Sequence, residues 1–245
     1  MKQFADLHVC PNLDDKEELE RIIRKASSLG CNLIGVSLPF RPRHKTINFL
    51  HRLCRDSCID LATRIDLAPK SSKDLLESLR LFRRRFDLVA VNCSSKSIAR
   101  QAAKDHRVDL LVFSSRNSHR RFFDLAEATL ASQSVAALEV NMALLLGCRG
   151  FSRARLLSCL WREAEIARRV GVSIVICSGA IDEFGLRSRH DFVSLAALFG
   201  MNDATALNAI SVAPQAIVTR NRGKLGSDYV SRGVRVVRKG RNCGD

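Results

Sequence analysis

Two ionisable residues, Asp6 and His8, stand two positions apart in an apolar stretch near the start of the chain. Alternate residues of a β-strand point to the same side, so we expect both side chains on one face. Further polar residues fall at matching positions of later apolar stretches, namely Arg64, Asp66, Asn92, Glu139 and Asn141. Unpaired burial of such groups is costly, so this face predicts either a hydrogen-bonded ion network around Arg64 or a metal site.

The metal alternative requires several histidines and carboxylates that converge on one cation. Of the six histidines only His8 falls on an expected strand, and the charge of Arg64 would oppose a bound cation. Cys54 and Cys58 are four residues apart in a helical segment, but two ligands do not make a zinc site. The sequence therefore favours a structural network without a metal. It contains no G-x-S-x-G, P-loop or H-E-x-x-H motif, so we assign no catalytic residue.

Basic residues stand where the apolar stretches end, and several of them precede an expected helix. Free N–H groups at a helix start favour anions, and arginine and lysine contact phosphates. These positions predict a phosphate-binding surface at one rim, composed of Arg41, Arg43, Lys45, Lys70, Lys96, Arg116, Arg187, Arg189, Arg220 and Arg222, with Ser178 beneath it.

Apolar runs and amphipathic stretches alternate along the chain and predict the elements that position these residues. We expect strands at 4–9, 33–40, 61–68, 88–93, 109–113, 136–142 and 173–177, with a last short one at 216–219. The apolar strand face, which includes Leu7 and Val9, is expected to pack under the helices. Seven or eight such units without a Gly-rich dinucleotide motif predict a distorted, TIM-like (β/α) barrel in one domain, residues 1–222. Residues 223–245 are expected to form a basic, flexible tail.

The composition points to a polyanionic partner. The 245 residues include 40 Lys and Arg against 25 Asp and Glu, which gives a net charge of +15. Such an excess favours nucleic acid as the partner. Because the chain has one Trp and one Tyr, we expect contacts to the nucleic-acid backbone rather than base stacking.

The cysteines and the hydropathy predict the compartment. The nine cysteines are scattered without a C-x-x-C pair, which is typical of a reduced, intracellular protein. No signal peptide and no apolar run of membrane-spanning length is visible. We therefore expect a cytoplasmic protein without a membrane partner.

Several of these residues resemble the ribonuclease P protein component 3 family, the archaeal counterpart of a eukaryotic ribonuclease P subunit. They are the Phe4-Ala-Asp-Leu-His8 segment, Glu139 and Asn141, and above all Ser178-Gly-Ala followed by Leu186-Arg-Ser-Arg189 and the helix start at Asp191. Ala213-Pro214 and Arg220-Asn221-Arg222 fit the end of that family's domain. The resemblance covers residues 3–222, although the family more often has Pro-Arg where this chain has Arg189-His190.

The resemblance implies a barrel related to the polymerase-and-histidinol-phosphatase superfamily, whose active members bind metals through a His-x-His on the first strand. Here that position reads Asp6-Leu7-His8. It implies an RNA-binding subunit of the ribonucleoprotein that removes the 5′ leader from precursor tRNA. In that family the RNA subunit cleaves with Mg²⁺, so no cofactor is expected on this chain. The implied partners are the ribonuclease P RNA, component 2 in a two-plus-two heterotetramer, other ribonuclease P proteins and precursor tRNA.

Two other functions remain open from the sequence. A stand-alone metal-dependent phosphoesterase of the same barrel superfamily would cleave phosphoesters without RNA and lose this activity in a His8→Ala variant. A scaffold whose charge serves only partner proteins would show no salt-sensitive RNA binding.

Overall fold

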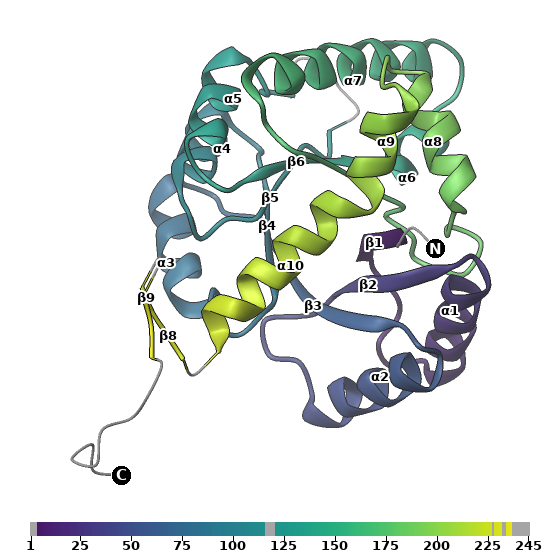
Figure 1. Cartoon of the computed structure of the whole chain (residues 1–245). Helices are drawn as coiled ribbons and strands as arrows, with labels where there is room; N and C mark the ends of the chain where they lie inside the picture. The colour runs from purple at the N-terminus through teal and green to yellow at the C-terminus, as the bar shows by residue number, and fades with distance from the viewer. Residues whose placement is uncertain (1–3, 116–120, 227, 232–233, 237–245) are drawn as a thin grey trace.

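The computed structural model describes residues 4–115, 121–226, 228–231 and 234–236, and its centre is a ring of seven parallel strands (Figure 1). The strands follow one another around the ring in chain order. They are β1 Phe4–Val9, β2 Cys31–Ser37, β3 Asp60–Leu67, β4 Leu88–Asn92, β5 Leu110–Val112, β6 Ala137–Asn141 and β7 Ile174–Cys177. The expected distorted, TIM-like (β/α) barrel is thereby confirmed.

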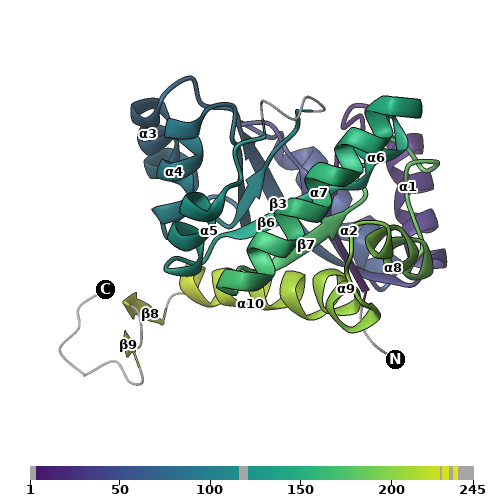
Figure 2. The ribbon, with the colours of Figure 1, turned by 90° about the horizontal axis from the view of Figure 1, so that it is seen from above.

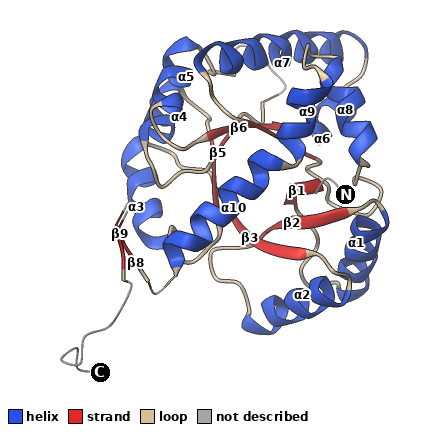
Figure 3. Ribbon diagram, viewed as in Figure 1, coloured by secondary structure: helices blue, strands red, loops and turns tan. Residues whose placement is uncertain are grey.

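The helices surround the strands, as Figure 3 shows. They are α1 Lys16–Ser28, α2 His44–Asp56, α3 Ser72–Phe82, α4 Lys96–Lys104, α5 Leu125–Ser132, α6 Met142–Leu146, α7 Gly150–Val170, α8 Arg189–Ala197, α9 Asp203–Ile210 and α10 Val212–Leu225. Side chains of Asp15, Ser71 and Ser95 accept a hydrogen bond from the first turn of α1, α3 and α4. These N-caps explain why the helices begin directly after the strand exits. No helix in the described part is long and apolar enough to span a membrane.

The barrel closes where β7 meets β1. Gly179 N–H donates to the carbonyl of His8 at 3.0 Å, and Cys10 N–H donates to the carbonyl of Ala180 at 2.7 Å. Val9 and Ala180 form an isolated parallel bridge. Closure thus depends on the segment just after β7, at the carboxyl ends of the strands.

The last helix, α10, covers the other end of the barrel. Figure 2 shows it along the edge opposite the strand exits, below β6 and β7. Its side chains of Ala213, Ile217 and Val218 complete an inner apolar cluster that includes Ala5, Leu7, Ala62 and Ala90. A larger apolar cluster lies between the strands and the outer helices.

Two predictions about these elements were wrong. The strand expected at 216–219 is part of α10, whose buried residues Ala213, Ile217 and Asn221 recur at helical spacing. Leu7, expected under the outer helices, packs in the inner cluster. The register of β1 against β2 shifts between Asp6 and Val9, and a simple alternation of faces cannot anticipate such an irregularity.

Residues beyond 222 include more structure than a flexible tail. The helix α10 continues to Leu225. Beyond it, β8 Tyr229–Ser231 pairs antiparallel with β9 Val234–Arg235.

Candidate nucleic-acid interface

The barrel interior contains a guanidinium held by four acceptor atoms. Arg64, in β3, is fully buried. Its Nη1 donates to Glu139 Oε2 at 2.6 Å and to the carbonyl oxygen of Leu7 at 2.9 Å. Its Nη2 and Nε donate to Asp66 Oδ1 at 2.7 and 3.0 Å, and Nε also lies 3.2 Å from Asp66 Oδ2. A buried arginine needs this set of charge-assisted hydrogen bonds, because burial would otherwise disfavour its charge.

His8 extends the network from β1. Its Nδ1 lies 2.5 Å from Glu139 Oε1. Burial and the nearby Arg64 lower the pKa of His8, but Glu139 and Cys10 raise it more, and the result is a pKa of about 10. Burial raises the pKa of Glu139, whereas Arg64 and His8 lower it by more, so its net shift is downward. His8 is therefore a cation at neutral pH, paired with a buried carboxylate.

The polar residues of this region do not fit a catalytic metal centre. The carboxylates of Glu139 and Asp66 are hydrogen-bonded to Arg64. Asp6 does not join them, and its Oδ1 accepts from the backbone N–H groups of His8 and Ser178 at 3.2 and 3.1 Å. Among the described residues no group of three or more His, Cys, Asp or Glu could hold a metal ion. The lumen is thus a paired ion network.

The two amides of the predicted lumen face serve local structure. Asn92 accepts from Ser114 Oγ at 2.9 Å, and Asn141 caps α6 by accepting from Ala143 N–H at 2.9 Å. The ion network itself is made by four other residues, His8, Arg64, Asp66 and Glu139.

The raised pKa of His8 predicts a pH-dependent stability. Its folded pKa of about 10 exceeds its ordinary value of 6.5, so its contribution is complete below pH 6.5 and is lost as the pH rises through 10. We expect the unfolding free energy of the wild type to exceed that of His8→Gln by on the order of 3 kcal/mol at pH 6. The difference should shrink steadily towards pH 10. Urea unfolding at several pH values measures it, and a difference that stays constant from pH 6 to 9 would contradict a charged His8.

Exposed cations line the carboxyl ends of β2, β3 and β4. Arg41, Lys70 and Lys96 follow these three strands, and their side chains are exposed. Lys45, in the first turn of α2, is exposed as well. Arg43 is exposed and lies 3.0 Å from Asp14, a surface pair of small energetic value. We call Arg41, Lys45, Lys70 and Lys96 the basic rim.

The loop between β7 and α8 positions its arginines differently. Arg187 is half-buried, and its Nη1 donates to the carbonyl oxygens of Phe184 and Leu186 at 2.7 and 2.8 Å. Arg189 begins α8. Ser188 and Asp191 form a reciprocal capping box there, which orders the helix start. Much of the Leu186–Asp191 motif therefore maintains the loop.

Three residues predicted at the interface lie elsewhere. Ser178 is 1 % exposed, and its hydroxyl accepts from Ala180 N–H at 3.0 Å, so it closes the barrel and does not reach a ligand. Arg220 and Arg222 belong to α10, at the opposite end. Arg220 donates to Asp109, and Arg222 donates to Asp60. The predicted strand at 216–219 would end just before these two arginines, but those residues belong to α10. Arg116, also predicted, lies outside the described residues.

The sequence interpretation missed other charged residues. Arg149, Arg153 and Arg155 are exposed at the start of α7, beyond the short helix α6 that separates them from β6. Arg121 and Glu163 form a bidentate ion pair at 2.7 and 2.5 Å, and both side chains are buried. Their separation of 42 residues along the chain leaves no sequence signal for this contact.

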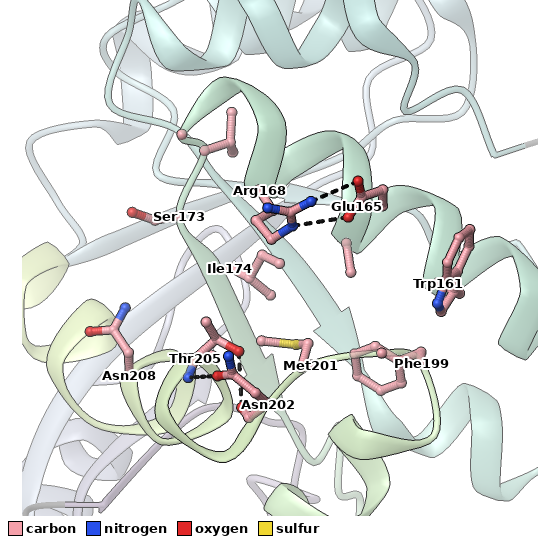
Figure 4. A pocket seen from close by; sticks show the side chains of 15 residues that line it. Trp161, Glu165, Arg168, Ser173, Ile174, Phe199, Met201, Asn202, Thr205 and Asn208 are labelled. Atoms are coloured by element: carbon pink, nitrogen blue, oxygen red, sulfur yellow. Dashed lines mark hydrogen bonds and ion pairs between the residues drawn. The ribbon is translucent and has the colours of Figure 1, made fainter.

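A pocket of about 300 Å³ lies away from the basic rim, between α7, the start of β7 and α9. Figure 4 shows Trp161, Phe199 and Met201 on one side of it and Asn202, Thr205 and Asn208 on another. The ion pair between Arg168 and Glu165 borders it. It contains none of the predicted site residues.

Fold and site together define a (β/α) barrel protein whose lumen is closed by ion pairs and whose strand exits carry exposed cations. A family model described as RNase P subunit p30 matches residues 3–225, and the chain belongs to this family.

Individual relatives agree with this assignment. The chain is similar to the ribonuclease P protein component 3 of Methanosarcina acetivorans, with 33 % identity over 178 residues that cover 71 % of each chain. It is 28 % identical to the component 3 of Methanococcoides burtonii over 237 residues, which cover 96 % of this chain and 94 % of the relative. A chain of a cryo-EM structure of archaeal ribonuclease P with mature tRNA shares its fold. The TM-score is 0.84 at 19 % identity, over 96 % of this chain and 99 % of that chain.

Proposed function

We propose that this chain is an RNA-binding, non-catalytic subunit of ribonuclease P, which removes the 5′ leader from precursor tRNA. The main support for the proposal is a difference between the lumen and the basic rim, which both lie at the carboxyl ends of the strands. The polar groups in the lumen are paired with one another around Arg64, whereas the cations of the basic rim are exposed. Such a surface neutralises RNA phosphates.

The proposal extends to the assembly. The Methanosarcina and Methanococcoides relatives are named ribonuclease P protein component 3, and the cryo-EM structure with the same fold contains archaeal ribonuclease P with mature tRNA. These names support a place in the ribonuclease P assembly. We propose that the chain lies there beside the ribonuclease P RNA and other ribonuclease P proteins, in the cytoplasm. We include component 2 as a direct partner, in a two-plus-two heterotetramer. Mg²⁺ is then used by the RNA, and this chain binds no cofactor.

The test removes three charges from the basic rim. We expect Arg41→Ala, Lys70→Ala and Lys96→Ala together to weaken binding of the ribonuclease P RNA about tenfold or more. The slope of log affinity against log salt should fall by roughly one unit for each phosphate that is no longer neutralised. Filter binding between low and moderate salt measures both quantities.

A matched variant separates location from net charge. Lys25→Ala, Arg55→Ala and Arg162→Ala remove the same charge from exposed positions in α1, α2 and α7. We expect this control to bind RNA nearly as tightly as the wild type. If both triple variants lose the same affinity, the basic rim is not the interface. Binding without any salt dependence in the wild type would instead indicate a scaffold for proteins.

A further inference from the structure

A second pocket lies at the opposite end of the barrel from the basic rim. Its volume is about 390 Å³, which is within the range of small-ligand sites. Its lining includes four arginines and lysines and one histidine, and it includes no aspartate or glutamate. The lining residues are Arg83, Arg84, His106, Arg107, Lys224, Leu225, Gly226, Tyr229 and Val230. We call this feature the amino-end pocket.

Three chain segments that are distant in sequence build the amino-end pocket. Arg83 is the C-cap of α3, and Arg107 lies in the turn between α4 and β5. Lys224 belongs to the last turn of α10, which leads towards β8 (Figure 2). Helix carboxyl ends carry partial negative charge, and basic side chains there are common. A single basic helix end would therefore not indicate a ligand. Here, however, basic residues from three separate segments line one concave site.

One nitrogen of the Arg83 guanidinium has no hydrogen-bond partner among the described residues. Arg83 Nη1 donates to Asp109 Oδ2 at 2.6 Å. The other terminal nitrogen, Nη2, is buried and is the atom without a partner in the described part of the chain. A buried donor without an acceptor is unfavourable. Because this atom has almost no exposed surface, an anionic oxygen in the pocket reaches it only after the Arg83 side chain shifts.

The carboxylates near the pocket are already paired. Asp109 also accepts from Arg220 Nη2 at 2.9 Å and from the backbone N–H of Val89 at 2.9 Å. Asp105 accepts from Arg107 Nε at 2.9 Å and Nη2 at 2.7 Å. Arg84 adds a further cation at the pocket, and its side chain is exposed. The charged residues that line the pocket are all basic, which favours an anionic ligand.

The aromatic ring of Tyr229 indicates which kind of anion the pocket could bind. Tyr229 is the only tyrosine of the chain, and it lines the pocket together with the arginines. Arginine binds phosphate with two parallel N–H donors, and an aromatic ring stacks on a nucleobase. A phosphate and an adjacent base occur together in a nucleotide, and an unpaired base is accessible to a ring only in a single strand.

We propose that the amino-end pocket binds one phosphate of single-stranded RNA, with the neighbouring base on Tyr229. The inference rests on the proposed function as an RNA-binding subunit and adds a second contact, remote from the basic rim. With contacts at both ends, one barrel connects two RNA segments on opposite faces. The pocket recognises a strand without a base-specific readout, because every base can stack.

The decisive comparison is between two adjacent arginines of the full-length chain. Arg84 lines the pocket and Arg85 does not, although both side chains are exposed. We expect Arg84→Glu to weaken binding of a short single-stranded oligoribonucleotide about tenfold at low salt and to reduce the salt slope by one to two units. Arg85→Glu should change the affinity less than threefold. Equal effects of the two substitutions, or no effect of either, would overturn the proposal.

Two further probes identify what the pocket recognises. Tyr229→Ser should weaken binding of the oligoribonucleotide about threefold to tenfold and leave binding of inorganic phosphate unchanged. An equal loss for both probes, or none for the oligoribonucleotide, would overturn the stacking role. The Nε–H signal of Arg83 in a ¹⁵N spectrum should shift when the oligoribonucleotide is added, and an unchanged signal would contradict contact at the pocket.

The same series separates this inference from the proposed function. If the triple variant of the basic rim binds RNA normally while Arg84→Glu does not, the rim proposal fails and the amino-end pocket remains. If the rim variant loses binding while Arg84→Glu and Arg85→Glu behave alike, the pocket proposal fails and the rim remains.

Discussion

Arg64→Met is expected to lower the free energy of unfolding by about 3–5 kcal/mol, because it leaves a buried carboxylate without its main counter-charge. Arg64 Nη1 lies 2.6 Å from Glu139 Oε2, and neither side chain is exposed. The same guanidinium satisfies the carbonyl oxygen of Leu7 at 2.9 Å. Methionine fills similar apolar volume but provides no donor to either oxygen. Urea unfolding followed by far-UV circular dichroism measures the decrease.

A double variant distinguishes removal of a charge partner from a change of shape. Arg64→Met with Glu139→Gln removes the buried carboxylate together with its main counter-charge. His8, whose pKa Glu139 raises and burial lowers, can then become neutral by losing its proton. The double variant should therefore be more stable than Arg64→Met alone. Arg80→Met, at an exposed position in the last turn of α3, controls for loss of one arginine and should change stability by less than about 0.5 kcal/mol. If the double variant is no more stable than the single one, the paired network is not what the arginine maintains.

Gly35→Ala should be comparably destabilising, by about 3 kcal/mol or more, or it should prevent folding. A Cβ at position 35, in β2, would lie less than 2.5 Å from the carbonyl oxygen of Leu7 and 2.7 Å from its Cα. These are backbone atoms of β1, so no side-chain rotation can relieve the overlap. Moving β1 would also displace the Leu7 carbonyl from Arg64. A side chain at position 35 would therefore also disrupt the hydrogen bond between Arg64 and the Leu7 carbonyl oxygen.

Gly226→Ala is the matched control for this substitution. Gly226 has a φ of −63°, and a Cβ there would lie 3.6 Å from its nearest neighbour, the carbonyl oxygen of Gly223. We expect it to change the unfolding free energy by less than about 1 kcal/mol. Thermal or urea unfolding of both variants measures the difference. A Gly35→Ala protein as stable as Gly226→Ala would show that β1 and β2 can separate without cost.

The periodicity of the sequence was sufficient to predict the barrel, because buried parallel strands and amphipathic helices alternate with strong contrast. It also predicted that Arg64, Asp66 and Glu139 share one face, since an alternation of two residues holds along β3 and β6. It failed for β1, where a register shift between Asp6 and Val9 changes which side chains point inward. The position of Asp6 relative to His8 therefore could not be obtained from spacing alone.

The position of the basic rim was predictable at β2, β3 and β4, because a basic residue closely follows each of these strands. It was not predictable at the end of the chain. The sequence predicts a short strand at residues 216–219, because Ile217 and Val218 are β-branched. Tertiary contacts decide the matter in favour of α10, since Ala213, Ile217 and Val218 fill the barrel interior. For the same reason the prediction placed Arg220 and Arg222 at the carboxyl ends of the strands, whereas they lie at the amino ends.

The closing role of α10 has a consequence for how the chain folds. Asn221 Nδ2 donates to the carbonyl oxygen of Asp87 across a separation of 134 residues, and Arg222 donates to Asp60 across 162 residues. The interior of the amino-terminal half is thus completed by the last described helix. Contacts of such long sequence separation are slow to form because long loops must close first. The barrel therefore reaches its packed state only after almost all of the polypeptide has been synthesised. The inner side chains of the first strands remain uncovered until α10 packs against them.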